Sequence, residues 1–262
     1  MELKDKIVVI TGAAGGIGKA MAARFQHEGT REVVVVDINE PGVRASAKEL
    51  GCIAMTADVS KEAELVRVIE ETERQVGPIG LFCSNAGIGA GADLQSPDEE
   101  WQLSWDVNLM PHVYAARHLV PRMIARGGGY LLNTASAAGL LNQIGGAAYG
   151  VTKHAAVGFG EWVAITHGHE GIKVSLLCPQ AVRTAMTENE GSATAAASGD
   201  GMMEPEELAQ VVVEGLRDER FLILPHPEVL TYMQRKAGDY DRWIGGMNRL
   251  AQRLMAGLPS QS

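Results

Sequence analysis

Tyr149 and Lys153 are the residues whose types and spacing most directly indicate chemistry. They lie four positions apart near the start of a stretch with helical periodicity, so both side chains share one face of the expected helix. A tyrosine hydroxyl titrates at about pH 10 in water, and a lysine cation beside it favours the phenolate. An activated phenol exchanges a proton with an alcohol, so the pair predicts acid–base catalysis.

A glycine-rich loop, Thr11 to Gly18, predicts a phosphate-binding turn. The loop follows an apolar run and leads into a helical stretch. Gly12 allows a sharp turn, Gly16 leaves room for a pyrophosphate against the backbone, and Gly18 lets the helix pack close to the sheet. The helix N-terminus then faces the phosphates, which indicates dinucleotide binding.

Asp37 predicts which dinucleotide is bound. It ends the second apolar run, nineteen residues after Gly18, where a carboxylate accepts hydrogen bonds from the adenosine ribose hydroxyls. A 2′-phosphate would be repelled there, and Ala13, Ala14 and Ile38 offer no compensating positive charge. Lys19 and Arg31 are expected to face solvent, so the sequence favours NAD over NADP.

Short β-branched runs alternate with longer helical stretches along the chain, and these elements must position the residues above. The expected strands are Lys6–Thr11, Glu32–Asp37, Cys52–Thr56, Ile79–Ser84, Gly129–Thr134, Lys173–Cys178 and Phe221–Leu224. The expected helices are Gly16–Glu28, Gly42–Leu50, Lys61–Gln75, Asp98–Ala125, Ala147–Glu170, Pro205–Arg217 and Glu228–Met255. This alternation predicts one α/β domain over residues 1–262, a doubly wound parallel sheet of seven strands with helices on both faces.

The chain resembles the short-chain dehydrogenase/reductase family over nearly its whole length. The glycine-rich loop, Asp58-Val59, Asn85-Ala86-Gly87 and the Tyr149/Lys153 pair match family motifs in the right order. The resemblance implies a single-domain Rossmann fold and an NAD(P)-dependent oxidoreductase. It also implies a homotetramer or homodimer, with no metal required for catalysis.

The resemblance and the loop analysis together give the expected site residues. The catalytic residues are Asn108, Ser136, Tyr149 and Lys153. The cofactor-binding residues are Gly12, Gly15, Gly16, Ile17, Gly18, Asp37, Ile38, Asp58, Val59, Asn85, Ala86, Gly87, Tyr149, Lys153, Pro179, Val182 and Thr184. The substrate-binding residues are Ser136, Tyr149, Gln143, Gln180 and Met186. Tyr149 removes the alcohol proton while Ser136 holds the substrate oxygen. Lys153 stabilises the phenolate and binds the nicotinamide ribose, and Asn108 positions a water that carries the proton onward.

Two positions depart from the family pattern. Ser84 stands where the family commonly has asparagine, a mild change. Gln180 stands where the family commonly has the glycine of a Pro-Gly pair, so a long polar side chain is expected beside the nicotinamide. Gln180 is therefore a candidate contact for the substrate.

Two segments bear on the substrate. Residues 184–203 are rich in Ala, Gly, Ser and Thr and are expected to form a mobile lid or a plain solvated loop. Residues 228–258 form a C-terminal helical region with an apolar stripe that packs on the core or on another subunit. The cleft is expected to be lined by Leu140, Leu141, Asn142, Gln143, Ile144, Met186, Met202 and Met203. This apolar set favours a hydrophobic, bulky secondary alcohol or its ketone.

Pro111 disturbs the long helix expected over Asp98–Ala125. Because proline lacks an amide hydrogen, the carbonyl of Val107 loses its usual partner. The sequence leaves two outcomes open, a kink near Asn108 or a plain break before Pro111.

Composition excludes several other classes of protein. The 262 residues carry a net charge of −9, which disfavours nucleic acid and membrane surfaces. No signal peptide or membrane span precedes the glycine-rich loop, so a cytoplasmic location is expected. Cys52, Cys83 and Cys178 are expected to be buried free thiols. His167 and His169 do not predict a metal site, and Ser136 lacks the nucleophile-elbow motif of hydrolases. A catalytically silent NAD(H)-binding regulator and a mainly reductive ketoreductase remain alternatives.

Overall fold

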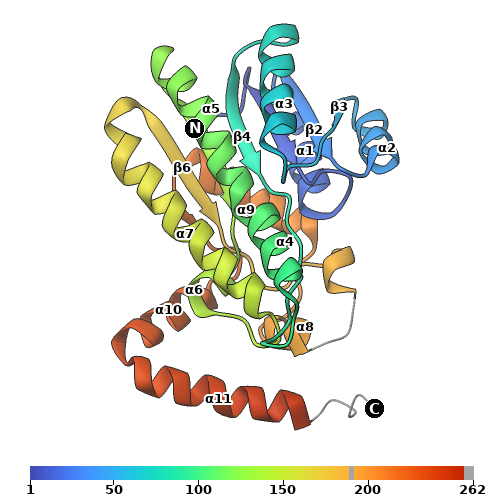
Figure 1. Cartoon of the computed structure of the whole chain (residues 1–262). Helices are drawn as coiled ribbons and strands as arrows, with labels where there is room; N and C mark the ends of the chain where they lie inside the picture. The colour runs from blue at the N-terminus through green and yellow to red at the C-terminus, as the bar shows by residue number, and fades with distance from the viewer. Residues whose placement is uncertain (189–191, 257–262) are drawn as a thin grey trace.

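A computed structural model describes residues 1–188 and 192–256 and contains one sheet of parallel strands. Its strand order is β3-β2-β1-β4-β5-β6-β7 (Figure 1). The strands are β1 (Ile7–Thr11), β2 (Glu32–Asp37), β3 (Ile53–Thr56), β4 (Ile79–Ser84), β5 (Gly129–Thr134), β6 (Ile172–Leu177) and β7 (Leu222–Ile223). The doubly wound parallel sheet expected from the sequence is confirmed. Its order reverses between β1 and β4, where α/β proteins bind ligands at the carboxyl ends of the strands.

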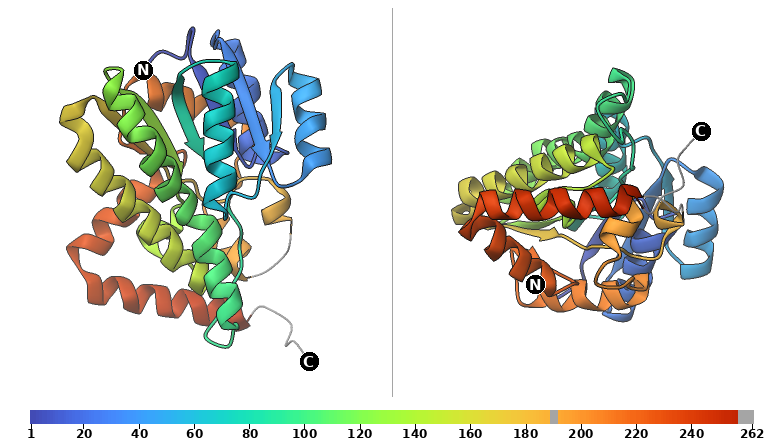
Figure 2. Two further views of the ribbon diagram at one scale, coloured as in Figure 1. Left: turned by 45° about the horizontal axis from the view of Figure 1, so that its top comes forward. Right: turned by 90° about the horizontal axis from the view of Figure 1, so that it is seen from below.

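Helices cover both faces of the sheet. Apolar side chains of each buried strand point alternately to the two faces, so both faces need covering. Val8 and Ile10 of β1 pack with α1 (Gly16–His27), α2 (Glu40–Leu50) and α9 (Pro205–Arg217). Val9 packs on the opposite face with α3 (Glu62–Gln75), α5 (Met110–Ala125) and α7 (Ala147–His167). Successive side chains of a strand point to opposite faces, so a strand covered on both sides is continuously apolar. Two views show the resulting three layers (Figure 2).

The expected helix Asp98–Ala125 is two helices, which settles the alternative left open at Pro111. α4 (Asp98–Asn108) ends before Leu109, whose backbone angles are φ −120° and ψ −54°. α5 begins at Met110 with Pro111 in its first turn, where a missing amide hydrogen costs nothing. The break makes Asn108 the last residue of a helix that points at the strand ends.

The expected helix Glu228–Met255 is also two helices, α10 (Glu228–Gly238) and α11 (Tyr240–Ala256), separated at Asp239. α10 is held by Lys236, whose Nζ donates to Leu140 O at 2.7 Å. The apolar stripe of α11 consists of Tyr240, Trp243, Ile244, Met247, Leu250 and Leu254. In the part of the chain that the structure describes, α11 buries no residue fully, and it crosses the lower side of the molecule (Figure 1).

The expected lid, residues 184–203, contains short helical pieces rather than a plain loop. They are η2 (Ala185–Thr187) and α8 (Ser192–Ala197), while residues 189–191 lie outside the described residues. A bridge between Val182 and Met203 fastens the two ends of the segment together. The two ends of the segment 184–203 therefore lie side by side, next to Val182 and Met203.

Further elements differ from the sequence-based expectation. A short helix, α6 (Ala138–Leu141), follows β5, and the 3-10 turn η1 (Gly168–Glu170) ends the helical stretch that α7 begins. Cys83 and Cys178 are buried free thiols, whereas Cys52 is only half-buried because it precedes β3. Among the described residues, no helix combines the length and apolar character needed to cross a membrane.

Candidate active site

The glycine-rich loop connects β1 to α1 at the carboxyl edge of the sheet, and two of its glycines have left-handed backbones. Gly12 has φ +68° and Gly16 has φ +52°, a region that residues with a Cβ rarely adopt. A Cβ on Gly18 would lie 2.2 Å from the carbonyl oxygen of Gly12. A Cβ on Gly15 would have no neighbour within 4 Å, so this side of the loop is open. The loop therefore fits a pyrophosphate against its backbone.

Asp37 closes the other side of the expected cofactor site. Its Oδ2 accepts a hydrogen bond from the backbone amide of Ala14 at 3.0 Å, which links the end of β2 to the glycine-rich loop. Its Oδ1 accepts from the amide of Asn39 at 3.0 Å. The following residue, Ile38, is 67% exposed, as expected of an apolar residue that covers an adenine ring. The Asp37 carboxylate and the exposed Ile38 fit the adenosine end of a nicotinamide dinucleotide.

Hydrogen bonds join the ends of three central strands. Thr11 Oγ1 accepts from the amides of Asn85 at 2.9 Å and Ala86 at 3.1 Å. The Asn85 amide nitrogen donates to Thr11 O at 3.0 Å, and its oxygen accepts from Thr134 Oγ1 at 3.0 Å. Sequence analysis missed the positioning role of the two threonines, although each is a polar residue ending an apolar strand.

The expected catalytic residues meet beside this junction. Tyr149 and Lys153 lie on α7, and Lys153 Nζ is 5.6 Å from the centre of the Tyr149 ring. Lys153 Nζ donates to Thr134 O at 3.0 Å, which holds the ammonium over the end of β5. Ser136 Oγ donates to Pro179 O at 3.4 Å and accepts from Ala138 N at 3.1 Å. Tyr149 and Ser136 also share a side-chain hydrogen bond.

Asn108 joins this group from the end of α4. Its Oδ1 accepts from Ile88 N at 2.9 Å, and its Nδ2 donates to Ile88 O at 3.0 Å and to Thr152 Oγ1 at 3.3 Å. A Cβ on Gly87 would lie 3.2 Å from Asn108 Oδ1 and 3.3 Å from Lys153 Nζ. Asn108 therefore fixes the turn after β4 through its side chain, and its expected role in holding a water stays a prediction.

Burial changes the titration of the pair in a way that the sequence did not indicate. Burial raises the pKa of Tyr149, and the hydrogen bond with Ser136 only partly opposes this effect. Burial lowers the pKa of Lys153 to about 8. In the protein alone, loss of water penalises both charged forms, so burial raises the tyrosine pKa and lowers the lysine pKa. The expected effect of the lysine on the phenol stays a prediction.

The Lys153 pKa predicts how stability depends on pH in the protein without cofactor. The unfolded lysine titrates near 10.4, so the burial penalty is complete below about pH 8 and is relieved as the pH rises. Relative to Lys153→Met, we expect the wild-type unfolding free energy to increase by roughly 2 kcal/mol from about pH 7 to about pH 9.5. Urea unfolding of both proteins measures this difference, and parallel pH profiles would contradict it.

The expected substrate-binding residues lie on three segments. Gln143, after α6, donates from Nε2 to Ala193 O at 2.8 Å and so contacts the segment 184–203. Gln180 donates from Nε2 to Asp200 Oδ2 at 3.1 Å. Met186 in η2 is 47% exposed. Of the other expected lining residues, Leu140 packs with residues of α10, and Met203 packs against the core and forms the bridge with Val182.

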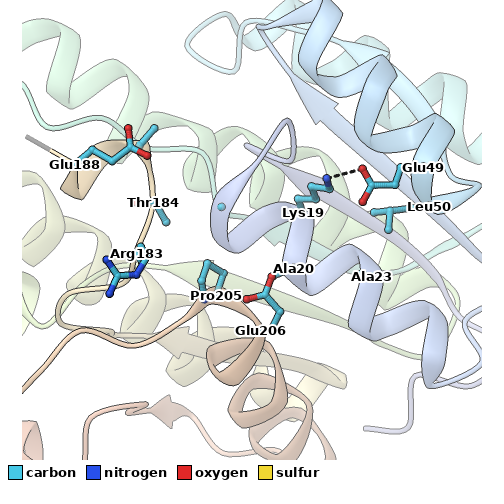
Figure 3. Close-up of a pocket in the computed structure, with 12 residues that line it drawn as sticks. Lys19, Ala20, Ala23, Glu49, Leu50, Arg183, Thr184, Glu188, Pro205 and Glu206 are labelled. Atoms are coloured by element: carbon cyan, nitrogen blue, oxygen red, sulfur yellow. Dashed lines mark hydrogen bonds and ion pairs between the residues drawn. The ribbon is translucent and has the colours of Figure 1, made fainter.

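A cavity of about 400 Å³ lies on the outer side of the glycine-rich loop (Figure 3). It is bounded by α1, the end of α2, the segment after Val182 and the start of α9. Gly16 and Thr184 are its only lining residues, among the described ones, that belong to the expected cofactor set. Lys19 binds Glu49 at 2.8 Å there, which agrees with its expected position facing solvent (Figure 3).

The remaining expected cofactor residues follow the strand ends. Asp58 accepts from Ser60 through Oδ1, and Val59 is nearly buried beside it. Pro179 and Val182 follow β6, Ile17 lies in the first turn of α1, and Thr184 lies against Gly16. Groups of three or more metal-binding side chains do not occur within residues 1–188 and 192–256.

Comparison with known proteins identifies the family. Residues 6–195 match the model of the short chain dehydrogenase family. The chain is 34% identical to human epidermal retinol dehydrogenase 2, over 87% of this chain and 76% of that protein. It is 32% identical to 1-deoxy-11-beta-hydroxypentalenate dehydrogenase of Streptomyces exfoliatus, over 93% and 91%. A short chain dehydrogenase/reductase from Burkholderia phymatum, solved with NAD, superimposes with a TM-score of 0.84 at 28% identity, covering 92% and 96%.

The protein therefore belongs to the short-chain dehydrogenase/reductase family and has its Rossmann fold. It is an oxidoreductase of the class that binds a nicotinamide cofactor and acts on alcohols.

Proposed function

We propose that the protein is an NAD-dependent oxidoreductase that interconverts a hydrophobic, bulky secondary alcohol and its ketone. The observation that carries the proposal is the meeting of Tyr149, Lys153 and Ser136 beside the glycine-rich loop. Proton transfer and cofactor binding are then available at one edge of the sheet. The human and Streptomyces relatives are named as dehydrogenases of retinol and of a hydroxypentalenate, and both of these compounds carry a hydroxyl group.

The four side chains have different roles in the proposed mechanism. Ser136 binds the substrate oxygen by turning its one hydroxyl proton from Pro179 O to that oxygen, while the amide of Ala138 holds Oγ in place. Tyr149 removes the alcohol proton during oxidation or returns it during reduction. Lys153 stabilises the phenolate and binds the ribose hydroxyls, while Asn108 holds the turn beside it. When bound, NAD supplies the hydride acceptor.

The preference for NAD rests on Asp37. Its carboxylate, oriented by Ala14 and Asn39, accepts from ribose hydroxyls and repels a 2′-phosphate. We expect Asp37→Ser to reduce the ratio of kcat/KM for NAD to that for NADP by about tenfold, since one lost charged interaction contributes about 1.4 kcal/mol. Steady-state kinetics with both cofactors measures the ratio. The exposed Asp218→Ser variant is the control, and an unchanged ratio in Asp37→Ser would refute the assignment.

The assembly and the compartment are part of the same proposal. We propose a homotetramer or homodimer, as the family resemblance implies, acting in the cytoplasm as one domain over residues 1–262. The exposed face of α11 is compatible with packing on another subunit.

The test is NADH formation by purified protein, followed by absorbance, with NAD and NADP offered separately. The alcohol panel covers primary, secondary, alicyclic, aromatic and steroid compounds, and the matching ketones test the reverse direction. Turnover with NAD and a secondary alcohol supports the proposal. Tight NADH binding without turnover of any compound would instead support a catalytically silent regulator.

A further inference from the structure

Gln143 and Gln180 both use their side-chain amides to hold one part of the chain, residues 193–203, which we call the strap. Gln143 Nε2 donates to the carbonyl oxygen of Ala193 at 2.8 Å, at the start of the strap. Gln180 Nε2 donates to the Asp200 carboxylate at 3.1 Å, near the end of the strap. The strap includes most of α8, and the two glutamines therefore hold it on both sides of this short helix.

The Asp200 carboxylate joins the strap to two other elements. Its Oδ2 accepts from Gln180, which follows β6, and its Oδ1 accepts from the Tyr232 hydroxyl of α10 at 2.9 Å. The Gln180 amide must present its NH2 group to Asp200, because the carboxylate would repel the amide oxygen. The backbone of Gln180 is fixed separately, since its amide donates to His226 Nδ1 at 3.2 Å. Asp200 thus fastens the strap to fixed parts of the fold.

The start of the strap is held by a residue that lies close to Tyr149. A Cβ on Gly146 would lie 2.9 Å from Gln143 Cγ and 3.6 Å from Tyr149 Cβ, so the two side chains flank this glycine. The Gln143 amide then reaches the Ala193 carbonyl. The position of the strap is therefore linked to the surroundings of the tyrosine that is proposed to transfer the proton.

The end of the strap is held next to Ser136. Ser136 Oγ donates to Pro179 O at 3.4 Å, and Pro179 directly precedes Gln180 in the chain. The strap therefore connects the surroundings of Ser136 and Tyr149, the two residues proposed to act on the alcohol. Helix α8 also contacts α11, which lies below it (Figure 1). This contact supports the strap from its outer side.

We propose that Gln143 and Gln180 are positioning residues that hold the strap across the substrate side of the active site, and that they act on the substrate through the strap. The inference rests on the proposed function. A strap held in place keeps water from the reacting groups and gives the bound alcohol a fixed wall to pack against. Glycine, the common family residue at position 180, has no side chain that could reach Asp200.

Hydrogen exchange of the strap tests the positioning role without requiring turnover. The amides of Ser198 and Gly201 are hydrogen-bonded within the strap, so their exchange reports on its local opening. We expect Gln143→Met, Gln180→Met and Asp200→Ala each to speed this exchange about tenfold, because each variant loses a hydrogen bond that holds the strap closed.

Two surface variants control for the same chemical changes. Gln75→Met replaces an exposed glutamine on α3. Asp218→Ala replaces an exposed aspartate that, like Asp200, accepts a hydrogen bond from a neighbouring side chain. Both controls should leave the exchange of the strap unchanged, and thermal unfolding shows whether every variant is folded.

Steady-state kinetics separates an effect through the strap from a direct contact with the substrate. Gln180→Met and Asp200→Ala break the same hydrogen bond, so each should raise KM for the secondary alcohol about tenfold with little change in kcat. The double variant should raise KM no further, because the second change removes nothing that the first had left. A direct contact between Gln180 and the substrate predicts instead that the two effects multiply.

The remaining outcomes distinguish this inference from the proposed function. Unchanged exchange of the strap in the three variants overturns the positioning role, and so do effects on KM that multiply. Absence of turnover with every alcohol and ketone overturns the proposed function alone. Exchange measured on the same proteins with NADH bound then still decides whether the two glutamines hold the strap.

Discussion

Tyr149→Phe is expected to reduce kcat with NAD by about a thousandfold, because general acid–base catalysis by one side chain contributes roughly 10²–10⁴-fold. The variant keeps the ring that packs beside Lys153 and removes only the hydroxyl that shares a hydrogen bond with Ser136. NADH binding should therefore change little. The measurement is steady-state turnover of a secondary alcohol, with NADH affinity determined by fluorescence on the same preparation.

Tyr130→Phe is the matched control for this result. Tyr130 is also buried, and its hydroxyl hydrogen-bonds Ser175 at 2.7 Å between β5 and β6, away from the catalytic group. We expect Tyr130→Phe to lose about 1 kcal/mol of unfolding free energy while keeping its turnover. Near-normal turnover in Tyr149→Phe with NAD still bound would show that the proton is transferred by another group.

Gly18→Ala should weaken NADH binding about a hundredfold, or by about 2.7 kcal/mol. The added Cβ would lie 2.2 Å from Gly12 O, 2.8 Å from Gly12 C and 2.9 Å from Ala13 Cα. All three are backbone atoms, so the loop itself must move, and the amides that face the pyrophosphate move with it. Fluorescence titration with NADH measures the loss, and thermal unfolding shows whether the variant is folded.

Gly158→Ala separates this steric effect from a general effect of replacing glycine. Gly158 lies on α7, and a Cβ there would meet no atom within 4 Å. Because alanine is the better helix former, this control should gain up to about 1 kcal/mol of stability and keep its NADH affinity. Wild-type NADH affinity in Gly18→Ala would mean that the loop does not hold the pyrophosphate.

Local patterns in the sequence were sufficient for the elements and for much of the candidate site. The β-branched runs and the glycine-rich loop predicted the parallel sheet and the β1–α1 turn, because strand burial and glycine backbone freedom depend on neighbouring residues. The spacing of Tyr149 and Lys153 predicted their shared face, because helix geometry alone brings residues four apart together. Element ends were less certain, as Leu109 shows, since a proline permits either a kink or a break.

Contacts between residues distant in the chain were decided only by the tertiary structure. Thr11, Asn85 and Thr134 meet because parallel strands end at one edge, and Gln180 meets His226 because β6 and β7 are neighbours. The pKa values of Tyr149 and Lys153 depend on how completely the fold removes water from them, and that quantity has no local signal. The sequence by itself therefore determined the class of chemistry. Packing determined the pKa shifts of Tyr149 and Lys153 and the contact between Gln180 and His226, because burial is a property of the whole fold.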